Sequence, residues 1–197
     1  MNMNKPATQK GIKAKEKIFQ KSLELFKEKG YVQTTLGDIC KEAGIANGTF
    51  YHYFKSKQDI CVNHIKQESI RLRDYYSSLV ISSYEEALVG VFKKQLESCD
   101  TVGQEFYKTM FIAELSSNQQ AFHLVADTSL DKTIVECIRK GQEINEFSKK
   151  HSAEHFTSLF IGQITLHTLK WSASEKHYDL KEKLLPELKF IINLLKY

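Results

Sequence analysis

Apolar residues recur three and four positions apart along most of the chain, a spacing that places them on one face of an α-helix. No segment shows the strict alternation of polar and apolar residues that is typical of a half-buried β-strand. The fold class is therefore predicted to be all-α. The breaks in the pattern, including Asp100, Asn118 and 145–151, predict a short helix containing Phe50 and Phe54 and further helices at about 12–29, 35–43, 57–79, 84–98, 103–117, 119–144, 152–173 and 180–196.

The stretch 34–57 (TTLGDICKEAGIANGTFYHYFKSK) has the most specific local pattern in the chain. Thr35 followed by Asp38 is a carboxylate variant of the capping box, which predicts that a helix begins there. Ile39 and the alanine four residues later give this helix one buried face. Gly44 predicts its end, because glycine readily takes a positive φ angle.

A second short helix follows this turn. Phe50 and Phe54 lie four residues apart and predict its buried face. The residues left toward solvent or at the edges of that face are Asn47, Thr49, Tyr51 and Tyr53. Two short helices around a glycine-containing turn are typical of a helix-turn-helix, and small polar and tyrosine side chains suit a DNA groove and its backbone. The pattern, at about 35–54, predicts double-stranded DNA as a partner.

A further capping box, Ser56 with Asp59, predicts the start of a long helix with Lys57 at its first position. A lysine beside the N–H groups of a helix start suits a phosphate contact. This helix links the DNA-reading part to the remainder. The predicted organisation is a polar arm (1–11), a three-helix helix-turn-helix DNA-binding domain with the start of the linking helix (12–72), and a further helical domain (73–197).

The charge of the chain is concentrated near the predicted DNA-binding motif. The net charge is +4, but residues 1–60 contain eleven lysines against six acidic residues, a net +5, so the remainder is close to neutral at −1. A basic excess at one end is expected of a phosphate-binding surface. Alone, it would also fit an ordinary solvated lysine-rich face, and only the motif separates these interpretations.

Other features of the composition exclude several classes of protein. No apolar run approaches the roughly 20 residues needed to cross a bilayer, and the polar N-terminus lacks the apolar core of a signal peptide, so we expect a cytoplasmic protein with no membrane partner. The four cysteines are scattered without a CxxC pair, which favours reduced, buried thiols over a disulfide or zinc framework; a redox sensor is the alternative.

The sequence contains no GxSxG, P-loop, dinucleotide fingerprint or HExxH pattern. We therefore predict no catalytic residues, no enzyme activity and no cofactor. His151 and His155 are four residues apart and suit two metal ligands on one helix face, but no third ligand accompanies them. A surface position is the favoured interpretation of this pair, and no metal site is predicted.

From Ile18 to about Ile60 the chain resembles the TetR/AcrR family of bacterial transcriptional regulators. The resemblance rests on LF followed by KGY in the first helix, then TTLGDI, KEAGIA, GTFYHYF and KSK at fixed spacing. It implies that phosphates are contacted by Thr35, Thr49, Tyr51 and Lys57, and that base edges are approached by Asn47, Gly48 and Tyr53. From the residues themselves, Thr35 also suits capping alone and Tyr51 also suits packing against the first helix.

Two positions depart from this family pattern. Gly37 lies where some relatives have a long base-reading side chain, so direct readout from that helix is expected to be poor. Ala46 lies where a serine or threonine often caps the recognition helix, which leaves the cap to Asn47 or to water.

The resemblance also gives the remaining helices an expected role. The last two predicted helices have apolar surfaces too wide for one helix partner, which fits either an ordinary core or, as the family implies, a homodimer interface. The family further implies a pocket for a small apolar or amphipathic effector among the middle helices. The residues predicted to bind that effector are Tyr107, Met110, Phe111 and His123, for each of which packed core is the competing interpretation.

These expectations combine into a homodimeric repressor that binds a palindromic operator and is released by a small-molecule effector. The alternative is a DNA-binding protein of the same fold that acts as an activator or chromosome-organising factor without small-molecule induction. An enzyme is the third and least supported hypothesis.

Overall fold

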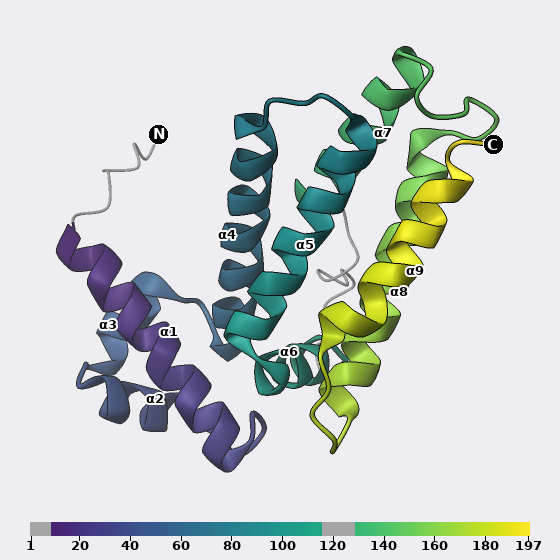
Figure 1. Ribbon diagram of the computed structural model, residues 1–197. Coiled ribbons are helices and arrows are strands. Elements are labelled where there is room, and N and C mark those ends of the chain that lie inside the picture. The colour runs from purple at the N-terminus through teal and green to yellow at the C-terminus, as the bar shows by residue number, and fades with distance from the viewer. Residues whose placement is uncertain (1–8, 116–128) are drawn as a thin grey trace. The chain divides into compact units, whose positions relative to one another are not determined.

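The computed structural model describes residues 9–115 and 129–197, and these residues form helices and connecting loops without a strand (Figure 1). The predicted all-α class is confirmed. The helices within the described ranges are α1 (Gln9–Lys29), α2 (Leu36–Ala43), α3 (Asn47–Tyr53), α4 (Lys57–Ser78), α5 (Tyr84–Val102), α6 (Gln104–Leu115), α7 (Ser129–Glu143), α8 (Ala153–Ala173) and α9 (Leu180–Leu194).

Most predicted helices are confirmed to within a few residues, but the break predicted at Asp100 is wrong. Asp100 lies inside α5, because Leu96 and Cys99 continue the buried stripe of that helix to its last turn. The helix ends instead at Gly103, whose φ angle of 90° is one that side chains with a Cβ rarely adopt. In the predicted helix 119–144, residues 129–143 are helical, and Asn118 lies outside the described residues.

The chain divides into two compact units, 1–62 and 63–197, and the division falls within α4, the predicted linking helix. In the first unit, α1 packs against α2, and α2 packs against α3. Its core consists of apolar side chains from all four helix segments of the unit: Ile18, Phe19, Leu25, Phe26, Ile39, Cys40, Ala43, Phe50, Phe54, Ile60 and Cys61.

In the second unit, α8 packs against α6, α7 and α9, while α5 packs against α6, α7 and α9. Phe92 of α5 and Phe160 of α8 lie side by side in its core, with ring centroids 4.9 Å apart. Trp171 is buried near the end of α8, and its indole N–H donates to Tyr178 O at 3.0 Å. Helix α9 contains Pro186 but begins at Leu180 with Asp179 as its N-cap, so the predicted element starts before the proline.

Glu146 joins the loop after α7 to the start of α5. Its carboxylate accepts hydrogen bonds from Ser83 Oγ at 2.6 Å and from the backbone N–H groups of Tyr84 and Glu85, both at 2.9 Å. Burial alone would raise the pKa of Glu146, but these hydrogen bonds outweigh it and the pKa is lowered. An acidic side chain that is more than 60 residues away therefore caps α5 in addition to Ser83, whose Oγ accepts from Glu86 N at 3.3 Å.

Among the described glycines of the second unit, Gly141 leaves the least room for a side chain. A Cβ added there would lie 2.3 Å from Phe147 Cδ2, and Phe147 is itself buried. We expect Gly141→Ala to lower the free energy of unfolding by about 1–3 kcal/mol through overpacking, despite the gain of up to about 1 kcal/mol that alanine brings to a helix. Denaturant unfolding measures the difference.

Gly162→Ala is the matched control, because a Cβ added at Gly162 of α8 meets no atom within 4 Å. The control variant should be at least as stable as the parent. Equal stability of the two variants would contradict the close packing of Phe147 on Gly141.

Candidate DNA-binding site

The first helix of the motif, α2, begins with the predicted capping box. Thr35 Oγ1 accepts from Asp38 N at 3.1 Å, and Asp38 Oδ2 accepts from Thr35 N at 2.9 Å and from the Thr35 hydroxyl at 2.8 Å. The hydrogen bonds from Thr35, with Lys29 nearby, lower the pKa of Asp38 from 3.8 to about 2. Thr35 is exposed, but its hydroxyl is already engaged in capping.

The turn between α2 and α3 is fixed by Gly44. This residue has φ 66° and ψ 41°, the left-handed conformation that glycine favours, and its N–H donates to Lys41 O at 3.1 Å. Ile45 N then donates to Cys40 O at 2.9 Å. The predicted helix-turn-helix geometry is confirmed in the backbone.

Helix α3 buries Phe50 and exposes its polar residues, whereas Phe54, which is predicted to lie within the helix, is its C-cap with an extended backbone (φ −139°, ψ 137°). Phe50 and Phe54 are almost completely buried, and their ring centroids lie 5.8 Å apart. Tyr51 is 60% exposed, with its ring edge against Phe50. The predicted contact residues Asn47, Gly48 and Thr49 are also exposed, whereas Tyr53 is half-buried. Ala46 is the N-cap of α3 and provides no side-chain hydrogen bond, as its methyl group requires.

Lys57 lies at the first position of α4, as predicted, but its ammonium group has partners within the protein. Lys57 Nζ donates to Tyr31 O at 2.8 Å and to Thr34 O at 2.5 Å, and it lies 4.6 Å from the centroid of the Tyr31 ring. Burial lowers the pKa of Lys57. The side chain thus connects the loop before α2 to the start of α4, a contact that no local sequence pattern indicates.

Ser56 and Asp59 lie at the start of α4, as predicted. Ser56 Oγ accepts from Asp59 N at 3.1 Å, which is one of the two hydrogen bonds of a capping box. Asp59 Oδ2 accepts from Lys55 N at 2.8 Å, one residue before Ser56.

His52 is an exposed residue of α3 that the sequence reasoning did not assign to the site. It lies four residues after Gly48 and three after Thr49, so helical spacing places it near the same face. Its ring is edge-on to Tyr53, with centroids 5.0 Å apart. Helical periodicity, applied to α3 residue by residue, would have found it.

The residues predicted to bind an effector lie in the second unit. Tyr107, Met110 and Phe111 of α6 are buried, and His123 lies outside the described residues. The Cys99 thiol donates to the Tyr107 hydroxyl at 3.2 Å. Burial, followed by the neighbouring Cys99, raises the pKa of Tyr107 well above its usual value. The three α6 side chains are therefore buried within the second unit. Their role as ligand contacts stays a prediction.

The last two helices expose several large apolar side chains. Leu159, Leu166 and Leu169 of α8 are each at least 40% exposed, as are Phe190 and Leu194 of α9. These residues are referred to below as the α8–α9 apolar surface. His167 of α8 and Glu187 of α9 connect the two helices through a 2.9 Å contact.

The cysteines and histidines show no reactive or metal-binding geometry in the described part of the chain. All four cysteines are buried, and burial raises the pKa of the Cys99 thiol to about 11 and that of Cys137 to about 12. His151 and His155 stack with ring centroids 5.3 Å apart, and within residues 9–115 and 129–197 no group of three potential metal ligands gathers. Over the same residues, no helix is both long and apolar enough to cross a membrane.

Comparison with known proteins agrees with this geometry. The family described as "Bacterial regulatory proteins, tetR family" matches residues 18–62. The HTH-type transcriptional regulator AcrR of Shigella flexneri is 25% identical over 200 residues, which cover 92% of this chain and 88% of the relative.

Two solved structures are similar over nearly the whole chain. The TetR-family repressor FadR of Thermus thermophilus, in complex with lauroyl-CoA, has a TM-score of 0.69 and 25% identity over 90% of this chain and 93% of that chain. FadR of Bacillus subtilis, in complex with stearoyl-CoA, has a TM-score of 0.70 and 20% identity over 91% and 96%. At 20% identity, the similarity to the Bacillus subtilis protein shows a common fold and nothing further.

The contacts of Lys57 generate a stability prediction. Lys57→Met retains most of the length and apolar stem of the side chain but removes both hydrogen bonds to the loop carbonyls. We expect a loss of about 1–2 kcal/mol in the free energy of unfolding, measured by thermal or denaturant unfolding. Lys55→Met, at an exposed lysine two residues away, is the control and should change stability little. If both variants unfold alike, the two carbonyl contacts add nothing to stability.

Proposed function

Because this chain is a TetR-family transcriptional regulator, we propose that it is a homodimeric repressor that binds a pseudo-palindromic operator and is released by a small amphipathic effector. The observation that supports DNA binding best is helix α3, which is anchored by Phe50 and Phe54 and leaves its small polar residues exposed. A rigid, short helix with such a surface suits insertion into a major groove.

The proposed contacts divide into two classes. Asn47, Gly48 and Tyr53 approach base edges, while Thr35, Thr49 and Tyr51 bind phosphates. Lys57 is assigned both a positioning role, through the carbonyls of Tyr31 and Thr34, and a phosphate contact through its remaining N–H. Phosphate contacts fix the register of the protein on DNA, whereas contacts to base edges determine the sequence preference.

The homodimer is proposed to form through the α8–α9 apolar surface. Phe190 is 64% exposed, and it is joined by four leucines of the same surface. Exposed side chains of this size on two neighbouring helices favour burial against a second copy. Two copies related by a two-fold axis would present two α3 helices to the two halves of a palindromic site.

The effector is proposed to bind in the second unit, near Tyr107, Met110 and Phe111. The complex of the Thermus thermophilus protein with lauroyl-CoA supports an amphipathic ligand, because that protein is 25% identical over most of both chains. Acyl-CoA thioesters are therefore the first class of effector to test. The buried, largely apolar surroundings of α6 suit an acyl chain better than a strongly polar ligand.

Selection of duplexes from fragmented source-genome DNA tests the proposal. The purified protein should enrich one or a few pseudo-palindromic sites at near-physiological salt, and added lauroyl-CoA should release them. Enrichment without release by any acyl-CoA would favour the alternative regulator that acts without such an effector. Recovery of no enriched site would contradict the operator-binding function itself.

Gly48→Ala separates DNA binding from folding. An added Cβ at Gly48 meets no atom within 4 Å in the free protein, so alanine should stabilise α3 by about 0.5–1 kcal/mol. At a close approach to DNA, however, the same methyl group should weaken operator binding. Thermal unfolding and a titration with the selected operator measure the two effects. Undiminished operator affinity in the more stable variant would remove Gly48 from the interface.

A further inference from the structure

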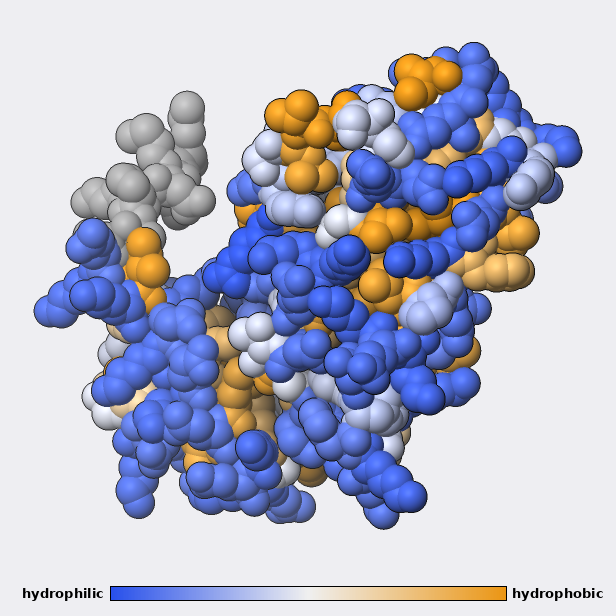
Figure 2. Space-filling model, in the orientation of Figure 1, coloured by the Kyte–Doolittle hydropathy of each residue, from blue (hydrophilic) through white to orange (hydrophobic). Residues whose placement is uncertain are grey.

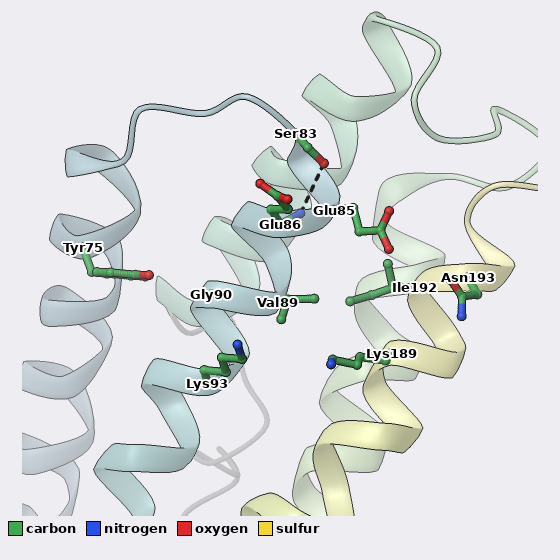
Figure 3. Close-up of a pocket in the computed structure, with 10 residues that line it drawn as sticks. All are labelled: Tyr75, Ser83, Glu85, Glu86, Val89, Gly90, Lys93, Lys189, Ile192 and Asn193. Atoms are coloured by element: carbon green, nitrogen blue, oxygen red, sulfur yellow. Dashed lines mark hydrogen bonds between the residues drawn. The ribbon is translucent and has the colours of Figure 1, made fainter.

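The second unit contains an open groove with a volume of about 700 Å³, between α4, α5 and α9 (Figure 3). This volume lies within the range of small-molecule sites, roughly 300–1,000 Å³. None of the residues predicted to bind the effector lines it. The lining residues are Tyr75, Ser83, Glu85, Glu86, Val89, Gly90, Lys93, Lys189, Ile192 and Asn193.

Helical spacing explains why these residues share one groove. On α5, Val89, Gly90 and Lys93 lie within one turn of each other, and on α9, Lys189 and Ile192 are three residues apart. Val89 and Ile192 provide an apolar wall, and Figure 2 shows apolar surface between α5 and α9 that is bordered by polar residues.

Tyr75 of α4 lines the groove because Gly90 of α5 has no side chain. A Cβ added at Gly90 would lie only 2.9 Å from the Tyr75 hydroxyl, so the absence of a side chain lets Tyr75 reach across to α5. Tyr75 is half-buried and points from α4 toward Gly90 (Figure 3). Because α4 begins at Lys57, an occupant that contacts Tyr75 would touch the helix shared by both units.

The two acidic residues that line the groove, Glu85 and Glu86, lie in the first turn of α5, and each interacts with a neighbouring side chain. Glu85 forms an ion pair with Lys196 at 2.6 Å. Glu86 accepts from Ser82 Oγ at 3.4 Å and lies in the first turn of α5, where the helix dipole favours a negative charge. Both carboxylates are therefore already stabilised within the protein, and we expect no cationic ligand to bind beside them.

The basic residues lie further along the groove. Lys93 and Lys189 form no ion pair with any acidic side chain of the described residues, and in Figure 3 the amine end of each points toward the space between α5 and α9. Two ammonium groups on facing helices beside an apolar wall are complementary to an anion with an apolar portion.

We propose that this groove is a second ligand site, which binds a small organic carboxylate with an apolar tail. The carboxylate lies between Lys93 and Lys189, and the tail packs against Val89 and Ile192. The site is distinct from the proposed effector pocket around α6, and its occupation requires neither DNA nor an acyl-CoA.

Calorimetric titration of the full chain with octanoate at neutral pH and low salt tests this site without DNA. We expect octanoate to bind more tightly than acetate, which lacks the tail, and than 1-octanol or octylammonium, which lack the negative charge. The double variant Lys93→Gln/Lys189→Gln should bind octanoate about tenfold more weakly, because it loses both charge-assisted contacts.

Lys94→Gln/Lys183→Gln is the matched control, because these two lysines lie on α5 and α9 outside the residues that line the groove, and their loss changes the net charge equally. The control should bind octanoate like the parent, and circular dichroism should show that all variants are folded. NMR shifts of the Gly90 and Ile192 amides should report the bound carboxylate. Absent binding, or equal affinity in the parent and the double variant, overturns the proposal and leaves operator binding untouched.

Discussion

The contact between the Lys57 ammonium and the carbonyls of Tyr31 and Thr34 connects three helix ends of the DNA-binding unit. The loop it contacts follows α1, Thr35 at the end of that loop caps α2, and Lys57 itself begins α4. The ammonium nitrogen also lies 4.6 Å from the centroid of the Tyr31 ring, and its partial burial strengthens these charge-assisted bonds relative to an exposed lysine. Helix α3 belongs to the same unit, where Gly44 forms the turn that joins it to α2 and the two helices pack together.

Whether a contact could be predicted from the sequence depends on how many residues separate its two partners along the chain. The Thr35–Asp38 capping box, the left-handed Gly44 and the burial of Phe50 and Phe54 all depend on residues within four positions, and all were predicted correctly. The acceptors of Lys57 lie 23 and 26 residues away, and the Glu146 cap of α5 lies more than 60 residues away. Such contacts depend on tertiary packing, which no local spacing encodes.

Helix α9 shows why a wide apolar pattern did not determine its own partners. Leu184, Leu188 and Ile192 are buried in the second unit, whereas Phe190 and Leu194 are exposed. The sequence shows all five as apolar, and only the packing of α5 and α8 on one side of the helix separates them. The exposed side chains are the ones proposed to contact a second copy, while Ile192, which is 1% exposed, lies at the floor of the groove.

The two proposed ligand sites differ in which existing interactions of the protein a bound ligand would break. The Tyr107 hydroxyl already accepts a hydrogen bond from Cys99 in a buried environment, so a ligand that displaced the Cys99 thiol would have to offset the loss of that bond. An acyl chain avoids this cost, because it makes only apolar contacts and forms no hydrogen bond with Tyr107. In the groove, Lys93 and Lys189 have no acidic partner among the described residues, so an anion that binds them displaces no ion pair of that part of the chain. The two proposals therefore differ in the ligand chemistry that they require: an acyl chain near α6, and a carboxylate with an apolar tail in the α5–α9 groove.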